Sequence, residues 1–131
     1  MLTEYLEIKQ IADTTIEQMG GRGMLTAMIG ASFPSNYFWH DDKCDLTVTI
    51  HFSFKGSRKY NECDITYNRA QDLYSMELVK SVTRKTKRND SGWGAYGITM
   101  VDRVKCLELH MLTGDQLAEV FTRHTGLYVT L

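Results

Sequence analysis

The chain lacks the cysteine pattern of a disulfide framework or a zinc ribbon. Its three cysteines, Cys44, Cys63 and Cys106, are odd in number, lie far apart and include no C-x-x-C pair. It also lacks a long apolar run: none approaches the ~18 residues that a membrane span needs, and acidic residues interrupt the apolar ones at the N-terminus. We therefore expect free, mostly buried thiols in a soluble, unsecreted cytosolic protein.

An excess of charge of one sign is lacking as well. Fifteen lysines and arginines face 16 acidic residues, which gives a formal net charge of −1. The surface as a whole can be neither a DNA-binding cation nor a DNA-mimicking anion, so any charge-based recognition must be local. No linker, repeat or low-complexity tract divides the 131 residues, and 43% hydrophobic residues suffice for one core. We expect a single domain spanning residues 1–131.

Known catalytic motifs are missing. There is no G-x-S-x-G, P-loop or Rossmann fingerprint, and MGGRG follows a predicted helix where phosphate loops precede one. The four histidines show no H-x-H or H-x-x-x-H spacing. His40-Asp41-Asp42 is best interpreted as a polar loop, because adjacent residues of an extended chain point in opposite directions. We expect no enzymatic activity, no metal and no cofactor.

Hydrophobic periodicity predicts a helix at each end of the chain. Near the N-terminus, Ile8, Ile11, Ala12, Thr15 and Met19 recur at steps of three and four residues, and Gly20-Gly21 would end this helix. Near the C-terminus, Thr113 and Gln116 have the spacing of a capping box, and Gly126 follows the apolar stripe at the position of a C-terminal cap.

Between these helices the sequence favours strands. Residues 45–54 (DLTVTIHFSF) alternate apolar and polar residues without a break, and residues 59–67, 73–82 and 96–109 are further candidates, the last bulged near Asp102-Arg103. Residues 24–33 (MLTAMIGASF) are short, apolar and bounded by Gly23 and Pro34, which favours a buried strand over a helix. The predicted class is α+β: an antiparallel sheet of about four to five strands, flanked by the N-terminal and C-terminal helices that cover its core face.

Three segments carry a resemblance to known proteins: TIEQMGGRGMLTAMIGA (15–31), ITYNRAQDLYSMELVK (65–80) and FTRHTGLYVTL (121–131). They resemble a widespread group of small uncharacterised proteins encoded by tailed phages and prophages. The region from Ser81 to Met111 is longer here than that group's pattern. The resemblance implies a phage accessory protein acting in the host bacterial cytoplasm, and it supplies no chemistry that can be transferred to particular residues.

The stretch RKTKRNDSGWGAYG (84–97) has the composition of a loop that binds phosphate and base. Its cations suit a phosphate, its rings suit stacking, and its glycines let backbone approach a ligand closely. A basic, glycine-rich hairpin tip with ordinary turn chemistry is the alternative. The candidate ligand-binding residues here are Arg84, Lys87, Arg88, Trp93 and Tyr96.

Two other segments could take part in recognition. Arg22, among the glycines of Gly20–Gly23, could meet an anion with its planar fork, although a capped helix with a solvated arginine is the simpler interpretation. Tyr37, Phe38 and Trp39 are three consecutive rings that cannot all point into one core, so we expect part of this run at an interface, such as one between identical subunits.

The favoured functional hypothesis is a non-enzymatic phage accessory protein that binds or sequesters a small anionic ligand, such as a nucleotide signal of host defence. The alternative is a protein–protein interaction module that inhibits a host enzyme, or a structural adaptor. The expected partners are a small nucleotide, a host protein and identical subunits, with no membrane. A weak nucleic-acid binder is the less favoured third hypothesis, and it would show steep salt dependence.

Overall fold

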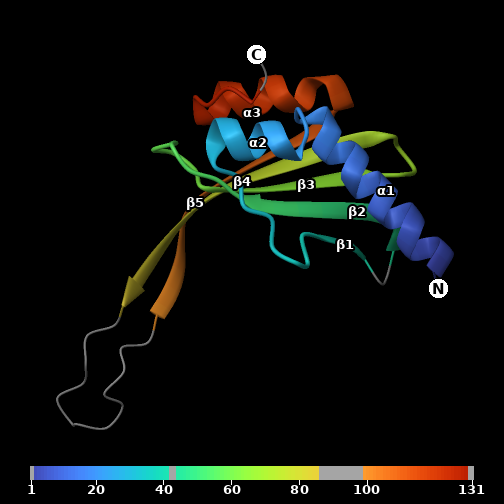
Figure 1. Ribbon diagram of the computed structural model, residues 1–131, viewed down its shortest axis with the longest axis horizontal. Coiled ribbons are helices and arrows are strands. Elements are labelled where there is room, and N and C mark those ends of the chain that lie inside the picture. Colours follow the sequence, from blue (N-terminus) through green and yellow to red (C-terminus); the bar gives the residue numbers. More distant parts are fainter. Residues whose placement is uncertain (1, 42–43, 86–98, 130–131) are drawn as a thin grey trace, which may run out of the picture.

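The computed structural model describes residues 2–41, 44–85 and 99–129, and their side chains within 5–40, 47–82 and 103–129 (Figure 1). Five strands form one antiparallel sheet in the order β1-β2-β3-β4-β5, so each strand pairs with its neighbour in sequence. This confirms the predicted α+β class. The elements are α1 (Leu2–Gln18), α2 (Arg22–Ile29), β1 (Phe38–Asp41), β2 (Cys44–Ser53), β3 (Glu62–Asn68), β4 (Leu73–Lys85), β5 (Thr99–Leu112), the 3₁₀ turn η1 (Gly114–Gln116) and α3 (Leu117–Thr125).

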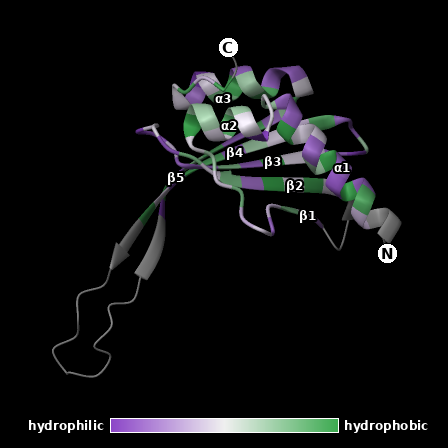
Figure 2. Ribbon diagram, in the orientation of Figure 1, coloured by the Kyte–Doolittle hydropathy of each residue, from purple (hydrophilic) through white to green (hydrophobic). Residues whose placement is uncertain are grey.

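All three helices lie on the same side of the sheet (Figure 1). Strand residues that alternate toward this side form the core with one stripe of each helix, because a half-covered antiparallel sheet buries every second side chain. Phe52 of β2 and Phe121 of α3 are both fully buried, with ring centroids 6.2 Å apart. The colouring of Figure 2 shows the same alternation along β2 and β3. Other buried members of this core are Ala12, Ile16, Met19, Leu25, Ile29, Val48, Ile50, Cys63, Ile65, Met76, Leu78 and Leu117.

The prediction of a strand at residues 24–33 is wrong, because residues 22–29 form the helix α2. Leu25 and Ile29, four residues apart, are the buried pair of this helix, while Thr26 and Ala27 between them are exposed. Gly30 takes a left-handed conformation with φ 62°, and the N–H groups of Gly30 and Ala31 close the helix on the carbonyl oxygens of Thr26 and Leu25. Gly30 therefore ends the segment as a short helix.

The first strand of the sheet lies later in the chain than predicted. β1 begins at Phe38 and includes His40, which the sequence had placed in a polar loop. β1 pairs with β2 in the register Phe38↔Ile50 and Trp39↔Thr49. The number of strands remains five because β1 replaces the segment that became α2.

The strands β4 and β5 are longer than the rest of the sheet. Their paired ends reach away from the body (Figure 1), because β3 begins only at Glu62, opposite Val79. Lys80 lies opposite Lys105, and a register shift after this pair places Arg103 opposite Ser81, so the predicted bulge falls beside Arg103. We call residues 80–85 and 99–105 the ribbon.

The predicted capping box is confirmed at the start of the C-terminal helical segment. The amide of Thr113 donates to Oε1 of Gln116 over 2.9 Å, and the capping geometry opens the turn η1, which continues into α3. Gly126 ends α3 in a left-handed conformation with φ 78°. No helix among the described residues is both long and apolar enough to cross a membrane.

Candidate binding surfaces

Arg22 is exposed, and its guanidinium lies against two aromatic rings. It lies in the first turn of α2, and its guanidinium carbon is 4.6 Å from the ring centroids of both Phe33 and Tyr37. The Tyr37 hydroxyl donates to Oδ1 of Asp13 on α1 over 3.0 Å. Burial, followed by this bond to Asp13, raises the pKa of Tyr37. Arg22 therefore contributes to the contact between α2, the loop after it and α1.

The three consecutive rings divide between the two sides of the sheet. Tyr37 is buried and Phe38 is partly buried against the core, and their ring centroids lie 4.9 Å apart. Trp39 points to the other side and is 45% exposed. Of the predicted interface residues, Trp39 is the one that presents its ring to solvent.

The other predicted ligand residues belong to a part of the chain that is only partly described. Arg84 lies on β4 within the ribbon, opposite Met100. Lys87, Arg88, Trp93 and Tyr96 lie outside the described residues. The assignment of these residues to a ligand site stays a prediction.

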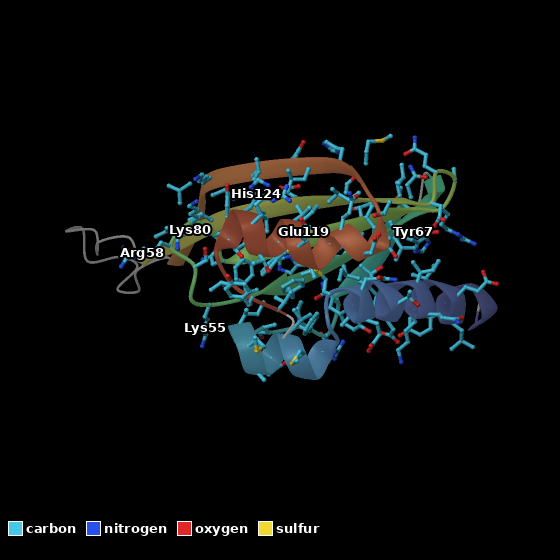
Figure 3. All side chains as sticks on the ribbon, turned by 90° about the horizontal axis from the view of Figure 1, so that it is seen from above. Lys55, Arg58, Tyr67, Lys80, Glu119 and His124 are labelled. Atoms are coloured by element: carbon cyan, nitrogen blue, oxygen red, sulfur yellow. The ribbon has the colours of Figure 1, made fainter. Side chains whose placement is uncertain are left out.

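A cluster of cations lies at the end of the sheet from which the ribbon starts. Lys80 and Lys105 face each other directly across β4 and β5, and Nζ of Lys105 is 5.1 Å from the centroid of the Tyr60 ring. Figure 3 shows Lys55, Arg58 and Lys80 at the same end, with Tyr67 at the opposite end. We call this cluster the basic end: Lys55, Arg58, Lys59, Lys80 and Lys105.

Nothing in the described part of the molecule neutralises the basic end. Among the described residues no ion pair involves any of its five cations. The side chain of Asn61 fixes the geometry, because it donates to the carbonyl oxygen of Ser81 over 2.7 Å and accepts from the Ser81 amide over 2.8 Å. The turn before β3 is thereby held against β4, so the positive charges are concentrated at one place on the surface.

The sheet face without helices carries the opposite charge. Cross-strand pairing places Asp64, Glu77 and Glu108 side by side on β3, β4 and β5. We call these three residues the acidic row. Like charges directly opposite each other on neighbouring strands repel. Arg103 compensates part of this charge, with Nη1 3.5 Å from Oε1 of Glu77.

His51 stands at the end of the acidic row, on β2 opposite Asp64. Its Nδ1 is hydrogen-bonded to Oδ1 of Asp64, and its Nε2 is 4.0 Å from Oε1 of Glu62. The hydrogen bond to Asp64 raises the pKa of His51 above its ordinary value, against the opposing effect of burial. Both ring nitrogens of His51 therefore lie beside carboxylates of β3.

A hollow of about 410 Å³ lies over the acidic row. Trp39, the three carboxylates and the imidazole of His110 line it. Polar contacts join other residues of the lining: Thr49 and Thr66 bond through their hydroxyls over 2.9 Å, and Nδ1 of His110 lies 3.3 Å from Oγ of Ser75. An aromatic face beside carboxylates suits an ammonium or guanidinium group and disfavours a phosphate.

Two members of the acidic row, together with Cys106, form the one group of metal-type donors close enough together among the described residues. Donor atoms of Glu77, Cys106 and Glu108 all lie within 4.8 Å of one another. The Cys106 thiol, however, donates to Oε1 of Glu77 over 3.2 Å, and this bond raises the thiol pKa. A metal would need the thiolate, and the bond to Glu77 disfavours that form. The group could hold a divalent cation only once the thiol has lost its proton.

A second hollow, of about 770 Å³, lies between α1, the turn after β3 and η1. Carboxylates of Glu7, Asp72 and Asp115 line it against a single cation, Arg69, whose Nη2 is 3.9 Å from Oε2 of Glu7. Asp72 accepts a 2.5 Å hydrogen bond from the Tyr67 hydroxyl, which raises the pKa of Tyr67 to about 12. The excess of carboxylates makes this hollow unsuited to an anionic ligand.

Sequence reasoning missed both charged surfaces. The segment FKGSRK (54–59) joins two predicted strands, and its three cations were a readable signal of local positive charge. The acidic row could not be predicted from the sequence, because its three members come from three strands and their proximity depends on the strand register.

Comparisons with protein-family models, with curated proteins and with solved structures found no match for this chain.

Proposed function

We propose that this protein is a non-enzymatic binding protein. It binds a small phosphate-bearing ligand, most specifically a nucleotide, at the basic end. The supporting observation is the concentration of five cations, none of them in an ion pair among the described residues, where the ribbon leaves the sheet. Lys80 and Lys105 directly oppose each other, and a phosphate between them would relieve their repulsion.

The neighbouring sequence is consistent with this location. Arg84 and Lys85 extend the positive charge along β4. Lys87, Arg88, Trp93 and Tyr96 follow in the chain, and they are the residue types that bind phosphate and stack on a base. We propose that the protein sequesters its ligand by binding it in a fixed ratio, without converting it to a product. The resemblance to small phage-encoded proteins favours a nucleotide signal of host defence as the natural ligand.

The test is calorimetric titration with two defined probes, ATP and a cyclic dinucleotide, at low and high salt. Neutralising Lys80→Gln or Lys105→Gln should each weaken probe binding by about tenfold or more, because a charge-assisted hydrogen bond contributes roughly 1.5–3 kcal/mol. Lys9→Gln is the matched control, since Lys9 is exposed on α1 and distant in sequence from the basic end. Binding unchanged in both variants, or absent from the wild type, would refute the proposal.

The alternative function, a module that binds a protein partner, is favoured by a different observation. The half-exposed Trp39 ring beside three carboxylates forms a surface suited to a cationic side chain. An oligo-lysine peptide would test it through the fluorescence of Trp39, after Trp93→Phe has removed the other tryptophan. Quenching that Glu77→Gln and Glu108→Gln abolish together would support this function, and an unchanged signal would exclude it for this face.

A further inference from the structure

The two charged surfaces lie on opposite faces of the same pair of strands. Glu77 and Glu108 oppose each other on the face without helices. Three residues further along β4, Lys80 opposes Lys105 on the face that carries the core residue Leu78, just beyond the helical cover. One chain therefore displays an acidic pair on one side of its sheet and a basic pair on the other.

We propose that the acidic face of one copy receives the basic end and ribbon of a second copy, so that the protein self-associates head to tail. Each surface contains like charges in direct cross-strand register. On the acidic face His51, Arg103 and His110 lie beside the three carboxylates, and an opposite charge from another molecule would relieve the repulsion that remains. The acidic face of each copy therefore complements the basic end of another copy of the same chain. This inference pairs the acidic face with the basic end, and it does not require that the basic end bind a nucleotide.

Exposed apolar side chains accompany the charges on both surfaces. Trp39 is 45% exposed at the hollow over the acidic row, and Val82, two residues beyond Lys80 on the same face of β4, is 44% exposed. A contact between them would supply apolar area at the centre of an otherwise polar interface. The formal net charge of −1 adds little long-range repulsion between copies.

The geometry of the contact determines the kind of assembly. The two surfaces differ, so the contact is heterologous and leaves one free acidic face and one free basic end on every dimer. Such a contact closes into a ring or grows into a chain. Because exposed ion pairs contribute little each and are screened by salt, the association should be weak and should disappear at high ionic strength.

The experiment uses two neutralised variants of the full chain in sedimentation velocity at low salt. The face variant carries Glu77→Gln and Glu108→Gln, and the end variant carries Lys80→Gln and Lys105→Gln. We expect the wild type to form oligomers that grow with concentration and dissociate in high salt. Each variant alone should remain monomeric, and an equimolar mixture should form a 1:1 complex and nothing larger, because only one intact interface is left.

Controls separate this interface from general effects of charge. A variant with Glu17→Gln and Glu119→Gln removes the same charge from exposed positions on α1 and α3, and it should assemble like the wild type. The face variant loses a repulsive pair together with the ion pair between Arg103 and Glu77, and the end variant loses a repulsive pair together with the contact of Lys105 with Tyr60. Because these losses and gains offset each other, both variants should melt close to the wild type. A variant that no longer unfolds cooperatively would mean that these charges are needed for the fold and are not available to a second copy.

Several outcomes would overturn the inference. A wild type that stays monomeric at low salt at every concentration would do so, as would a face variant that assembles normally. A mixture of the two variants that fails to associate would exclude the head-to-tail contact. Binding of an oligo-lysine peptide to the acidic face of a monomeric wild type would assign that face to a different basic partner. Failure of the nucleotide titration would leave all these results unchanged, because that titration tests the basic end alone.

Discussion

The Arg22 guanidinium carbon lies 4.6 Å from the ring centroid of Tyr37 and 4.6 Å from that of Phe33. The sequence suggested an anion ligand at Arg22, because glycines surround it. In the structure those glycines free the chain to turn from α1 into α2, with Gly20 and Gly21 at φ 109° and 91°. The arginine at this turn is then placed against two aromatic faces.

Replacing Arg22 should lower stability and leave ligand binding intact. Arg22→Ala removes two cation–π contacts and the packing of the aliphatic stem, so the free energy of unfolding should fall by about 1–2 kcal/mol. Urea denaturation followed by circular dichroism measures this change. Arg22→Lys should lose less, because it keeps the charge and the stem. Unchanged stability together with lost ATP binding would instead make Arg22 a ligand residue.

Phe121 should be among the most sensitive core positions. Its ring is fully buried against Phe52 and Phe54, with centroid distances of 6.2 Å and 5.0 Å. Phe121→Ala should cost about 3–5 kcal/mol, because it leaves a cavity between α3 and the sheet. Tyr128→Ala is the control at a 70% exposed ring and should change stability by less than about 0.5 kcal/mol. Equal losses in both variants would mean that α3 does not pack as described.

The pair of His51 and Asp64 should make stability depend on pH. Hydrogen bonding to Asp64 raises the pKa of His51 above 6.5 in the folded protein. Its stabilising effect is therefore complete below pH 6.5 and is lost as pH rises through the raised pKa. Titration of the His51 imidazole by NMR should show the raised value, and Asp64→Asn should lower it. A His51 pKa at or below 6.5 in the wild type would contradict the described contact.

The two described thiols should differ in reactivity. Burial raises the pKa of Cys63 far above its ordinary value, whereas Cys106 is exposed and its pKa is raised mainly by the hydrogen bond to Glu77. In a Cys44→Ser background, iodoacetamide at mildly alkaline pH should modify Cys106 slowly and Cys63 only after unfolding. Glu77→Gln should accelerate the modification of Cys106. Mass spectrometry of the alkylated peptides distinguishes the two sites, and an unaffected rate would argue against the bond from Cys106 to Glu77.

The amino-acid sequence by itself determined the elements whose signals are local. Alternation along residues 45–54 established β2, and the capping box at Thr113 and Gln116 established the start of the C-terminal helical segment, because periodicity and capping involve residues a few positions apart. The prediction from sequence was wrong for residues 24–33, because a short apolar run has too few turns to show a helical period. The glycines on both sides of this run were the signal of a helix, since they cap α2.

Tertiary structure alone decided the surfaces. The acidic row needs the pairing of three strands, and a shift of one residue in register would turn its carboxylates toward the core. The opposition of Lys80 and Lys105 likewise depends on the register in which β4 pairs with β5. Only the path of the chain in and before β1 decided that the Trp39 ring is exposed while the rings of Tyr37 and Phe38 pack against the core. Charge and aromaticity are properties of residues, but a binding surface is a property of the register that brings those residues together.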